Sequence, residues 1–322
     1  MNISNYNAIK EFIYVNNINI ILVGLCGSRA YGTAIDNNDY HSDYDYRGIY
    51  LNSIDELIGI KTDKGQICDT QTDTVIYSFG KFIKLLIACN PNIIELIGTR
   101  NSEVIYESDL SKEIRTNAHQ FLSKKCFHSF AGYATAQLRR LENALARDSY
   151  TKIEKERHIM KSIEGQFLAE RMPEGIRHDS FQFSLHDDEI HVSVELNDVP
   201  LKTLLNTQSA ISNTIKNFGK LNHRNHKKDE QHLNKHAMHL IRLYLMAIEI
   251  LEKQEIHTYR DKDHDLLMSI RNGEVPYPDI FKLQQELETK LHKAYQNTKL
   301  PEKPDLNWIN NFVYEMRNKY AE

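Results

Sequence analysis

The sequence contains no long apolar run, and its beginning lacks the features of a secretory signal. No segment approaches the roughly 18 consecutive apolar residues that a membrane-spanning helix requires. Residues 1–14 show neither a basic start nor a small-residue cleavage site. The widely spaced cysteines include no Cys-x-x-Cys pair, and they are Cys26, Cys68, Cys89 and Cys126. These absences favour a cytoplasmic protein with free thiols and no membrane partner.

The chain also lacks an excess of basic residues. Its 40 Lys and Arg residues stand against 44 Asp and Glu residues, which gives a formal net charge of −4. Dedicated nucleic-acid-binding domains are usually basic, so this balance argues against a protein that covers long nucleic acids. A local basic patch can still bind RNA, because net charge describes the whole surface and not one cleft.

The first hundred residues alternate between helix-like and strand-like segments. Short apolar or alternating runs predict strands at residues 18–26, 43–51 and 73–78. Apolar residues at helical spacing predict helices at residues 5–16 and 79–89. The second helix is expected to end before Pro91, because the residue before a proline disfavours the helical conformation. This order predicts a small mixed α/β unit over residues 1–100.

The remaining chain has a mainly helical pattern. Apolar residues recur at 3.6-residue spacing in residues 121–148, 151–172, 201–221, 229–253, 265–270, 277–297 and 307–320. Two alternating segments between residues 181 and 195 flank Asp187-Asp188 and predict one β-hairpin. With 322 residues, the chain is long enough for two domains. We therefore expect an α+β protein with a mixed domain at residues 1–100 and a mainly helical domain at residues 101–322.

The stretch GLCGSRAYGT, residues 24–33, carries the first chemical signal. A strand that ends at Gly27-Ser28 and turns into a helix exposes unpaired backbone N–H groups at the start of that helix. Such groups bind phosphate, and the helix dipole favours the negative charge. Glycine lets a ligand approach the backbone closely, and Ser28 adds a hydroxyl donor. We therefore predict that Gly27 and Ser28 bind the phosphates of a nucleotide.

Asp43 and Asp45 carry the second signal. They lie two residues apart on a predicted strand, so their side chains point to the same face. Adjacent carboxylates repel each other unless a cation lies between them, and oxygen ligands around a nucleoside triphosphate suit Mg²⁺, with Mn²⁺ as the alternative. We expect two ions. One lowers the pKa of an attacking hydroxyl, and the other neutralises the phosphates as pyrophosphate leaves.

Together these motifs resemble the signature of the DNA polymerase β-like nucleotidyltransferases. The fuller wording, GSRAYGT followed by SDYDYRG, is similar to a bacterial and phage group of predicted nucleotidyltransferases, some of which belong to RNA-repair pathways. Residues 81–96, 235–243 and 270–274 resemble further blocks of that group, so the resemblance covers most of the chain. It implies a palm-like sheet with helices, a helical region that completes the active-site cleft, and Asp43 and Asp45 as metal ligands.

The resemblance further implies a third metal-binding acid on a neighbouring strand. Asp73 opens the predicted strand at residues 73–78 and is our choice, with Asp69 as the alternative. Asp73 shares a face of that strand with Val75 and Tyr77, so it can join the other two acids only at the edge of the strand. A simple turn residue is the competing interpretation of Asp73.

Two arginines flank the predicted phosphate site. Arg29 lies in the first turn after Ser28, and Arg47 shares a strand face with the two aspartates of the motif. Either guanidinium can hold phosphate, and Arg47 can also neutralise the acids. An ion pair with a structural role is the alternative for each.

A cationic face on the predicted helix at residues 229–253 is a further candidate. Lys235, His239 and Arg242 fall within roughly 60° of each other, given ~100° per residue, and lie opposite an apolar stripe. Because the family-like wording includes these residues, we expect them to line the cleft and to contact the triphosphate or the acceptor. A solvated face is the alternative.

These features predict an enzyme that transfers a nucleoside monophosphate from an NTP such as ATP to a hydroxyl on RNA, at a tRNA-like 3′ end. The same chemistry on a protein side chain (AMPylation) or on a small molecule is the first alternative, because the fold hosts all of these activities. A non-catalytic nucleotide-binding module is the second. The intact Asp43 and Asp45 argue against it, since a module without metal has no use for two carboxylates that repel each other.

Overall fold

The computed structural model describes residues 11, 14–15, 18–37, 40–57, 63–149, 181–186, 189–202, 204–205, 208–209 and 230–320. The chain divides into two compact units. Residues 1–138 and 234–322 form the first unit, and residues 139–233 form the second. The first unit runs across residue 100, where the sequence predicts a domain boundary, and that boundary stays a prediction.

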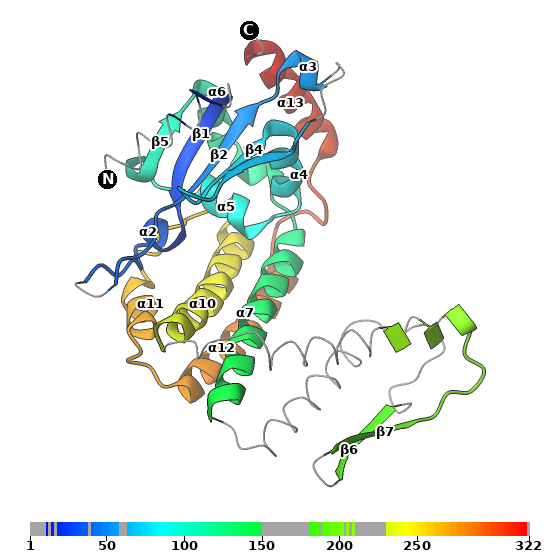
Figure 1. Cartoon of the computed structure of the whole chain (residues 1–322). Helices are drawn as coiled ribbons and strands as arrows, with labels where there is room; N and C mark the ends of the chain where they lie inside the picture. The colour runs from blue at the N-terminus through cyan, green and yellow to red at the C-terminus, as the bar shows by residue number, and fades with distance from the viewer. Residues whose placement is uncertain are drawn as a thin grey trace. The chain divides into compact units, whose positions relative to one another are not determined.

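A five-stranded mixed sheet forms the centre of the first unit (Figure 1). Its strands are β1 (Asn19–Cys26), β2 (Asp45–Leu51), β3 (Gln66–Asp69), β4 (Thr74–Ser78) and β5 (Val104–Glu107). The order across the sheet is β3-β4-β2-β1-β5, with β2 parallel to β4 and the other neighbours antiparallel. The predicted mixed sheet is confirmed. The sequence did not predict β3 and β5, because four residues are too few for a clear alternation.

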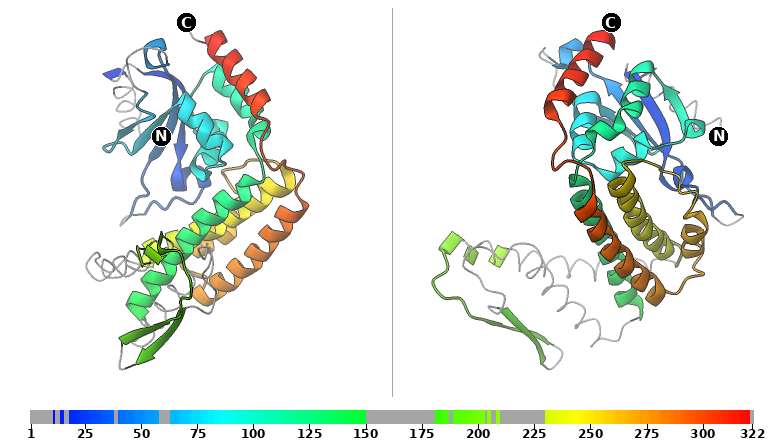
Figure 2. Two further views of the ribbon diagram at one scale, coloured as in Figure 1. Left: turned by 90° about the vertical axis from the view of Figure 1, so that its right-hand side faces the viewer. Right: turned by 180° about the vertical axis from the view of Figure 1, so that it is seen from behind.

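Helices pack against one face of this sheet (Figure 2). They are α4 (Phe79–Ile87), α5 (Pro91–Ile97) and α6 (Asp109–Thr116). The Ser78 side chain accepts a hydrogen bond from the Lys81 N–H and so starts α4. Asn90 caps α5 in the same way, with Pro91 at its first position. Gly24 of β1 lets α5 approach closely, since an added Cβ would lie 3.2 Å from Leu96.

Short elements connect the strands and helices of this unit. They are α2 (Gly27–Tyr31), α3 (Ile54–Leu57), η1 (Asn101–Glu103) and η2 (Ala118–Phe121). The chain then enters α7 (Lys125–Ser149), which continues into the second unit.

The C-terminal helices complete the first unit. They are α10 (Glu230–Lys253), α11 (His264–Arg271), α12 (Tyr277–Asn297) and α13 (Leu306–Tyr320). The helices α10 and α12 lie side by side, and Gln284 donates to the Tyr244 hydroxyl at 3.1 Å between them (Figures 1 and 2). These bounds confirm the helices predicted at residues 229–253, 265–270, 277–297 and 307–320. Those predicted at 151–172 and in most of 5–16 and 201–221 lie outside the described residues.

The described part of the second unit contains the predicted hairpin. Its strands β6 (Phe181–His186) and β7 (Glu189–Val194) are antiparallel, with Phe181 opposite Val194. Within the described parts of both units, no helix combines the length and apolar character that crossing a membrane requires.

Candidate active site

The turn after β1 brings Gly27 against the side chain of Asp45. Cys26, the last residue of β1, lies opposite Asp45 in the antiparallel pair with β2. Gly27 then has a φ of +65°, and a Cβ at this position would lie 1.9 Å from Asp45 Oδ2. Glycine is therefore required twice, for its backbone conformation and for the space that the carboxylate occupies.

Ser28 follows inside the single turn of α2. Its side chain is buried, and its carbonyl accepts a hydrogen bond from the Thr33 N–H at 2.8 Å. The residue before the helix is Cys26, whose side chain makes no capping hydrogen bond. The start of α2 therefore has no side-chain cap, as expected of a helix start that is left for a ligand.

Asp73 lies beside Asp45. It occupies the turn before β4, with a φ of +48°, and its carbonyl accepts a hydrogen bond from the Tyr46 N–H at 3.1 Å. Because β2 and β4 are parallel neighbours, this register brings the carboxyl groups of Asp45 and Asp73 within hydrogen-bond reach of each other. Burial, with the adjacent Asp73, raises the pKa of Asp45 to about 6.

This carboxyl pair fits a divalent cation. Two carboxylates in contact lose free energy through repulsion, and a bound cation would relieve it. The neighbouring Asp69 has a different environment. It accepts hydrogen bonds from the Thr72 hydroxyl at 2.6 Å and from the Gln71 N–H at 3.0 Å, and these lower its pKa. The contacts therefore favour Asp73 over Asp69 as the acid that acts together with Asp45.

Asp43 is exposed and lies just outside β2, which begins at Asp45 and thus two residues later than the sequence predicts. Among the described residues, the group that brings three potential metal-ligand atoms within 4.8 Å of one another is Glu249, Glu255 and His257. Asp43 thus completes no such group with Asp45 and Asp73. Glu249 already pairs with a neighbouring arginine and lysine, so its group is an ordinary charged surface cluster.

Arg29 is engaged by protein groups. Its guanidinium forms two hydrogen bonds of 2.9 Å with the Asp36 carboxylate and donates to the Ser42 carbonyl at 2.6 Å. It also lies 3.7 Å from the centre of the Tyr44 ring. Arg29 therefore binds both Asp36 and Ser42, and Ser42 lies just before β2.

Arg47 and Lys235 place positive charge near the carboxyl pair. Arg47 lies on β2, half-buried, two residues after Asp45. Lys235, half-buried on α10, is close enough to oppose the effect of burial and of Asp73 on the pKa of Asp45. These two cations therefore favour the ionised form of Asp45, which is the form that binds metal.

Of the other predicted cations of α10, Arg242 is buried and His239 is half-buried. Burial, followed by the charges of Arg242 and Lys235, holds the pKa of His239 well below its usual range. Its ring packs edge-on against Tyr31 of α2, with the ring centres 5.7 Å apart. Because burial favours the neutral form, His239 offers a neutral ring and not a positive charge.

Arg242 forms a buried ion pair that the sequence did not reveal. Its Nη1 lies 2.7 Å from Glu95 Oε1, and both side chains are at most 4% exposed. The Tyr31 hydroxyl donates to Glu95 Oε2 at 2.5 Å, and the Arg242 guanidinium stacks 3.6 Å from the centre of the Tyr31 ring. Three elements, α2, α5 and α10, thus meet at Glu95. The available signal was a lone acid among the isoleucines and the leucine of the helix PNIIELI.

The comparisons with known proteins concern the half of the chain that carries these carboxyl groups. A model of the RNA repair pathway DNA polymerase beta family matches residues 1–164. This match spans Gly27, Ser28 and the three predicted metal-binding aspartates. Neither a curated protein nor a solved structure matches the chain.

Proposed function

The chain belongs to the RNA repair pathway DNA polymerase beta family, and from this membership we propose that it is a Mg²⁺-dependent nucleotidyltransferase. The enzyme transfers a nucleoside monophosphate from an NTP to an acceptor hydroxyl and releases pyrophosphate. The family description favours RNA as the acceptor, and our proposal is a hydroxyl at a tRNA-like 3′ end. The observation that carries the proposal is the contact between the carboxyl groups of Asp45 and Asp73 beside the Gly27 turn.

Asp45 and Asp73, joined by the exposed Asp43, are the residues that would hold the metal. Bound Mg²⁺ supplies positive charge that activates the attacking hydroxyl and stabilises the phosphates. The protein contributes a pair of oxygen ligands held in contact by the β2–β4 register. Asp73 is fixed there by its own backbone, since its carbonyl accepts the Tyr46 N–H.

The Gly27-Ser28 turn and Lys235 are the groups that we propose for the triphosphate. Gly27 places the start of α2 directly against the Asp45 carboxylate, so phosphates bound to that turn lie beside the metal ligands. Lys235 adds a charge that acts on Asp45 from α10. We propose that the positive charge of Arg47, on β2, stabilises the ionised carboxylate of Asp45. We propose that Arg29 holds the segment before β2 through its bond to Asp36.

His239 and Arg242 are proposed to act indirectly. Arg242 binds Glu95, which accepts the Tyr31 hydroxyl of α2, so the pair links α10 to the helix that follows Gly27. His239 packs on the same tyrosine. Both residues therefore position the phosphate turn rather than contact the nucleotide.

A transfer assay tests the proposal. The purified protein is incubated with Mg²⁺ and each α-³²P-labelled NTP, and total RNA, a cell protein extract and a small-molecule extract are offered separately as acceptors. Label in RNA is the expected result, and the productive NTP identifies the transferred base. Label confined to protein or to small molecules would replace the RNA acceptor with one of those classes.

Two variants make the assay specific for the proposed site. Asp45→Asn preserves the shape of the side chain and removes its charge, and it should abolish labelling. Asp69→Asn makes the same chemical change on a carboxylate that is held by Thr72 and Gln71, and it should leave labelling intact. Absence of label in every fraction, with NTP binding retained, would instead favour a nucleotide-binding module without catalysis.

A further inference from the structure

A cavity of about 260 Å³ lies near the turn that carries the candidate active site. The cavity is lined by residues from the strands and turns around it. They include Arg29, Tyr44, Tyr46 of β2, Leu25 of β1 and Glu103 of η1. The volume is large enough for a planar heterocycle of one or two rings. None of the functions assigned to Gly27, Asp45 or Asp73 uses this space.

One wall of the cavity is aromatic. The rings of Tyr44 and Tyr46 are stacked, with their centres 6.4 Å apart and an angle of 16° between their planes. The Arg29 guanidinium lies on the Tyr44 ring, 3.7 Å from its centre. Leu25 and Ile105 add apolar surface. Flat aromatic and guanidinium groups of this kind stack on the faces of nucleobases.

Two residues of the cavity wall carry buried polar atoms with unused hydrogen-bonding capacity. Within the described part of the chain, Arg29 Nε and Glu103 Oε2 are buried and have no hydrogen-bond partner. The first is a donor and the second an acceptor. Buried polar atoms are normally paired, so their presence points to a ligand that offers one acceptor and one donor. Burial also raises the pKa of Glu103, although the charge and the backbone N–H of Arg100 act in the opposite direction.

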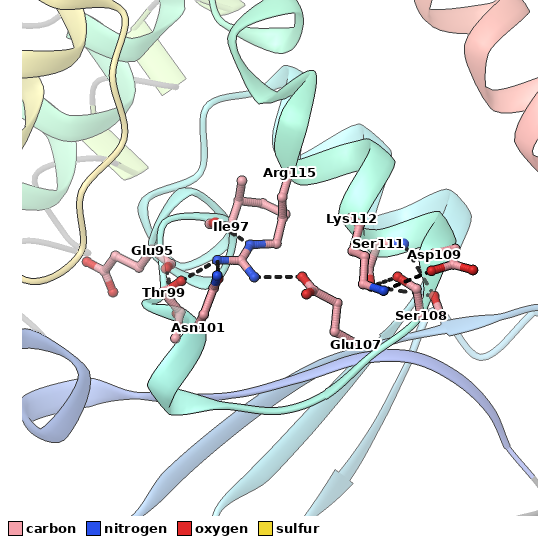
Figure 3. A network of polar contacts seen from close by, with 10 residues as sticks. All are labelled: Glu95, Ile97, Thr99, Asn101, Glu107, Ser108, Asp109, Ser111, Lys112 and Arg115. Atoms are coloured by element: carbon pink, nitrogen blue, oxygen red, sulfur yellow. Dashed lines mark hydrogen bonds and ion pairs between the residues drawn. The ribbon is translucent and has the colours of Figure 1, made fainter.

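The wall that carries Glu103 is held in place by Arg115 of α6 (Figure 3). Its guanidinium donates to the Ile97 carbonyl at 3.2 Å and to the Thr99 carbonyl at 2.5 Å. It also binds the side chains of Asn101 at 3.1 Å and Glu107 at 2.6 Å. These contacts fix the chain on both sides of η1, so the cavity wall is formed before any ligand arrives.

We propose that this cavity binds a nucleobase, stacked on the Tyr44 side and hydrogen-bonded to Arg29 and Glu103. The proposal rests on the proposed nucleotidyl transfer, and it names where a base of that reaction is recognised. Arg29 directly follows Ser28, and Tyr44 lies between Asp43 and Asp45. Asp45 and Tyr46 are neighbours on β2, so their side chains point to opposite faces of the strand, and Tyr44 stacks on Tyr46. The base therefore lies near the carboxyl pair, on the face of β2 opposite the Asp45 side chain.

The polar pair in the wall recognises the edge of a base. Adenine and cytosine each present an amino donor beside a ring-nitrogen acceptor, which matches Glu103 and Arg29. Guanine and uracil present an N–H donor beside a carbonyl acceptor, so they meet the same requirement. The base of the NTP and the terminal base of the acceptor RNA share this chemistry, and the experiment separates them.

The test measures equilibrium binding to the full chain by calorimetry. One arm uses the four NTPs and ribose 5-triphosphate, which lacks a base. The other uses short RNAs that end in each of the four nucleotides. The variants are Glu103→Gln, which replaces the acceptor oxygen by an amide, and Ile105→Trp, which fills the cavity. Glu286→Gln, on the exposed side of α12, is the matched control, and thermal unfolding verifies that each variant is folded.

In whichever arm contains the ligand of this cavity, NTPs or RNAs, both cavity variants should weaken binding of the base-bearing probes by about tenfold or more. Binding of ribose 5-triphosphate should not change. Dissociation constants within twofold of wild type in both arms, in folded variants, would overturn the cavity proposal, whether or not transfer occurs. Altered base binding in a protein that transfers nothing would retain the cavity and reject the proposed function.

Discussion

Asp45 and Glu95 are two acids in the interior of the first unit, and their surroundings differ. Glu95 meets the Arg242 guanidinium on one oxygen and the Tyr31 hydroxyl on the other. Asp45 meets a second carboxyl group, Asp73, and its pKa is raised to about 6 by burial and by that neighbour. One acid is satisfied by the fold, and the other has a charge that Arg47 and Lys235 offset only in part.

This difference separates structural acids from ligand-binding acids. A buried carboxylate with a complete set of partners gains nothing from a further cation, and removal of a partner destabilises the protein. A carboxyl pair in contact has the opposite property, because a cation or a neutralising substitution relieves its repulsion. Substitutions at the two sites should therefore change stability in opposite directions, and only those at Asp45 should abolish transfer directly.

The largest expected effect is on the free energy of unfolding, at the buried ion pair of Glu95 and Arg242. Arg242→Ala leaves Glu95 buried without its cation, which should lower the free energy of unfolding by about 3–5 kcal/mol. Urea denaturation measures this change. The double variant Glu95→Gln/Arg242→Met removes both charges and should recover much of the loss. If Arg242→Ala cost less than about 1 kcal/mol, the pair would not be the buried link between α5 and α10 that its geometry describes.

Asp45→Asn should produce the next largest effect, on catalysis and not on folding. Loss of an outer partner of a metal site costs 10–100-fold in activity, so loss of a direct ligand should lower kcat by more than about 100-fold. The unfolding free energy should stay equal or rise, because repulsion with Asp73 is removed. Activity near that of wild type would place the metal site elsewhere.

Gly27→Ala tests the close approach of the turn to Asp45. The added Cβ would meet Asp45 Oδ2 and would occupy a positive-φ position, so a loss of about 1–3 kcal/mol is expected, with transfer also reduced. Gly132→Ala is the matched control. It lies in α7, has no atom within 4 Å of the added Cβ, and should be neutral or slightly stabilising. Thermal unfolding compares the two, and equal melting temperatures would contradict the contact.

The smallest effect concerns pH. The pKa of Asp45 is raised from 3.8 in the unfolded chain to about 6 in the fold. The native state therefore binds more protons between these values, and stability from this group falls as pH rises from about 4 to 6. Relative to wild type, Asp45→Asn should gain on the order of 1 kcal/mol over that interval once solvent screening is allowed for. Urea denaturation at pH 4 and pH 7 measures the gain, and a constant difference would contradict the raised pKa.

The sequence predicted the elements whose patterns are long or strongly apolar. The strand β1 and the helices α10 and α12 follow directly from their periodicity. The sequence also predicted the turn at Gly27, where β1 ends. The space that Gly27 leaves for the Asp45 carboxylate is seen only in the fold. The sequence predicted Asp73 as the first residue of a strand, whereas it lies in the turn before β4. Its approach to Asp45 comes from the register between β2 and β4.

The partner of Arg242 did not follow from the sequence. Helical spacing places Lys235, His239 and Arg242 on one face, but it does not show which helix packs there. Only the fold brings Glu95 of α5 to that face, so Arg242 is buried. The cavity beside Tyr44 depends in the same way on β5, which the sequence did not predict.

Binding of Mn²⁺, followed by electron paramagnetic resonance, tests most directly whether Asp45 and Asp73 form the metal site. Wild type is compared with Asp45→Asn, Asp73→Asn, Asp69→Asn and Glu255→Gln. We expect at least tenfold weaker binding in the first two variants and binding within twofold of wild type in the last two. Unchanged binding in Asp45→Asn and Asp73→Asn, or a loss confined to Glu255→Gln, would contradict this expectation.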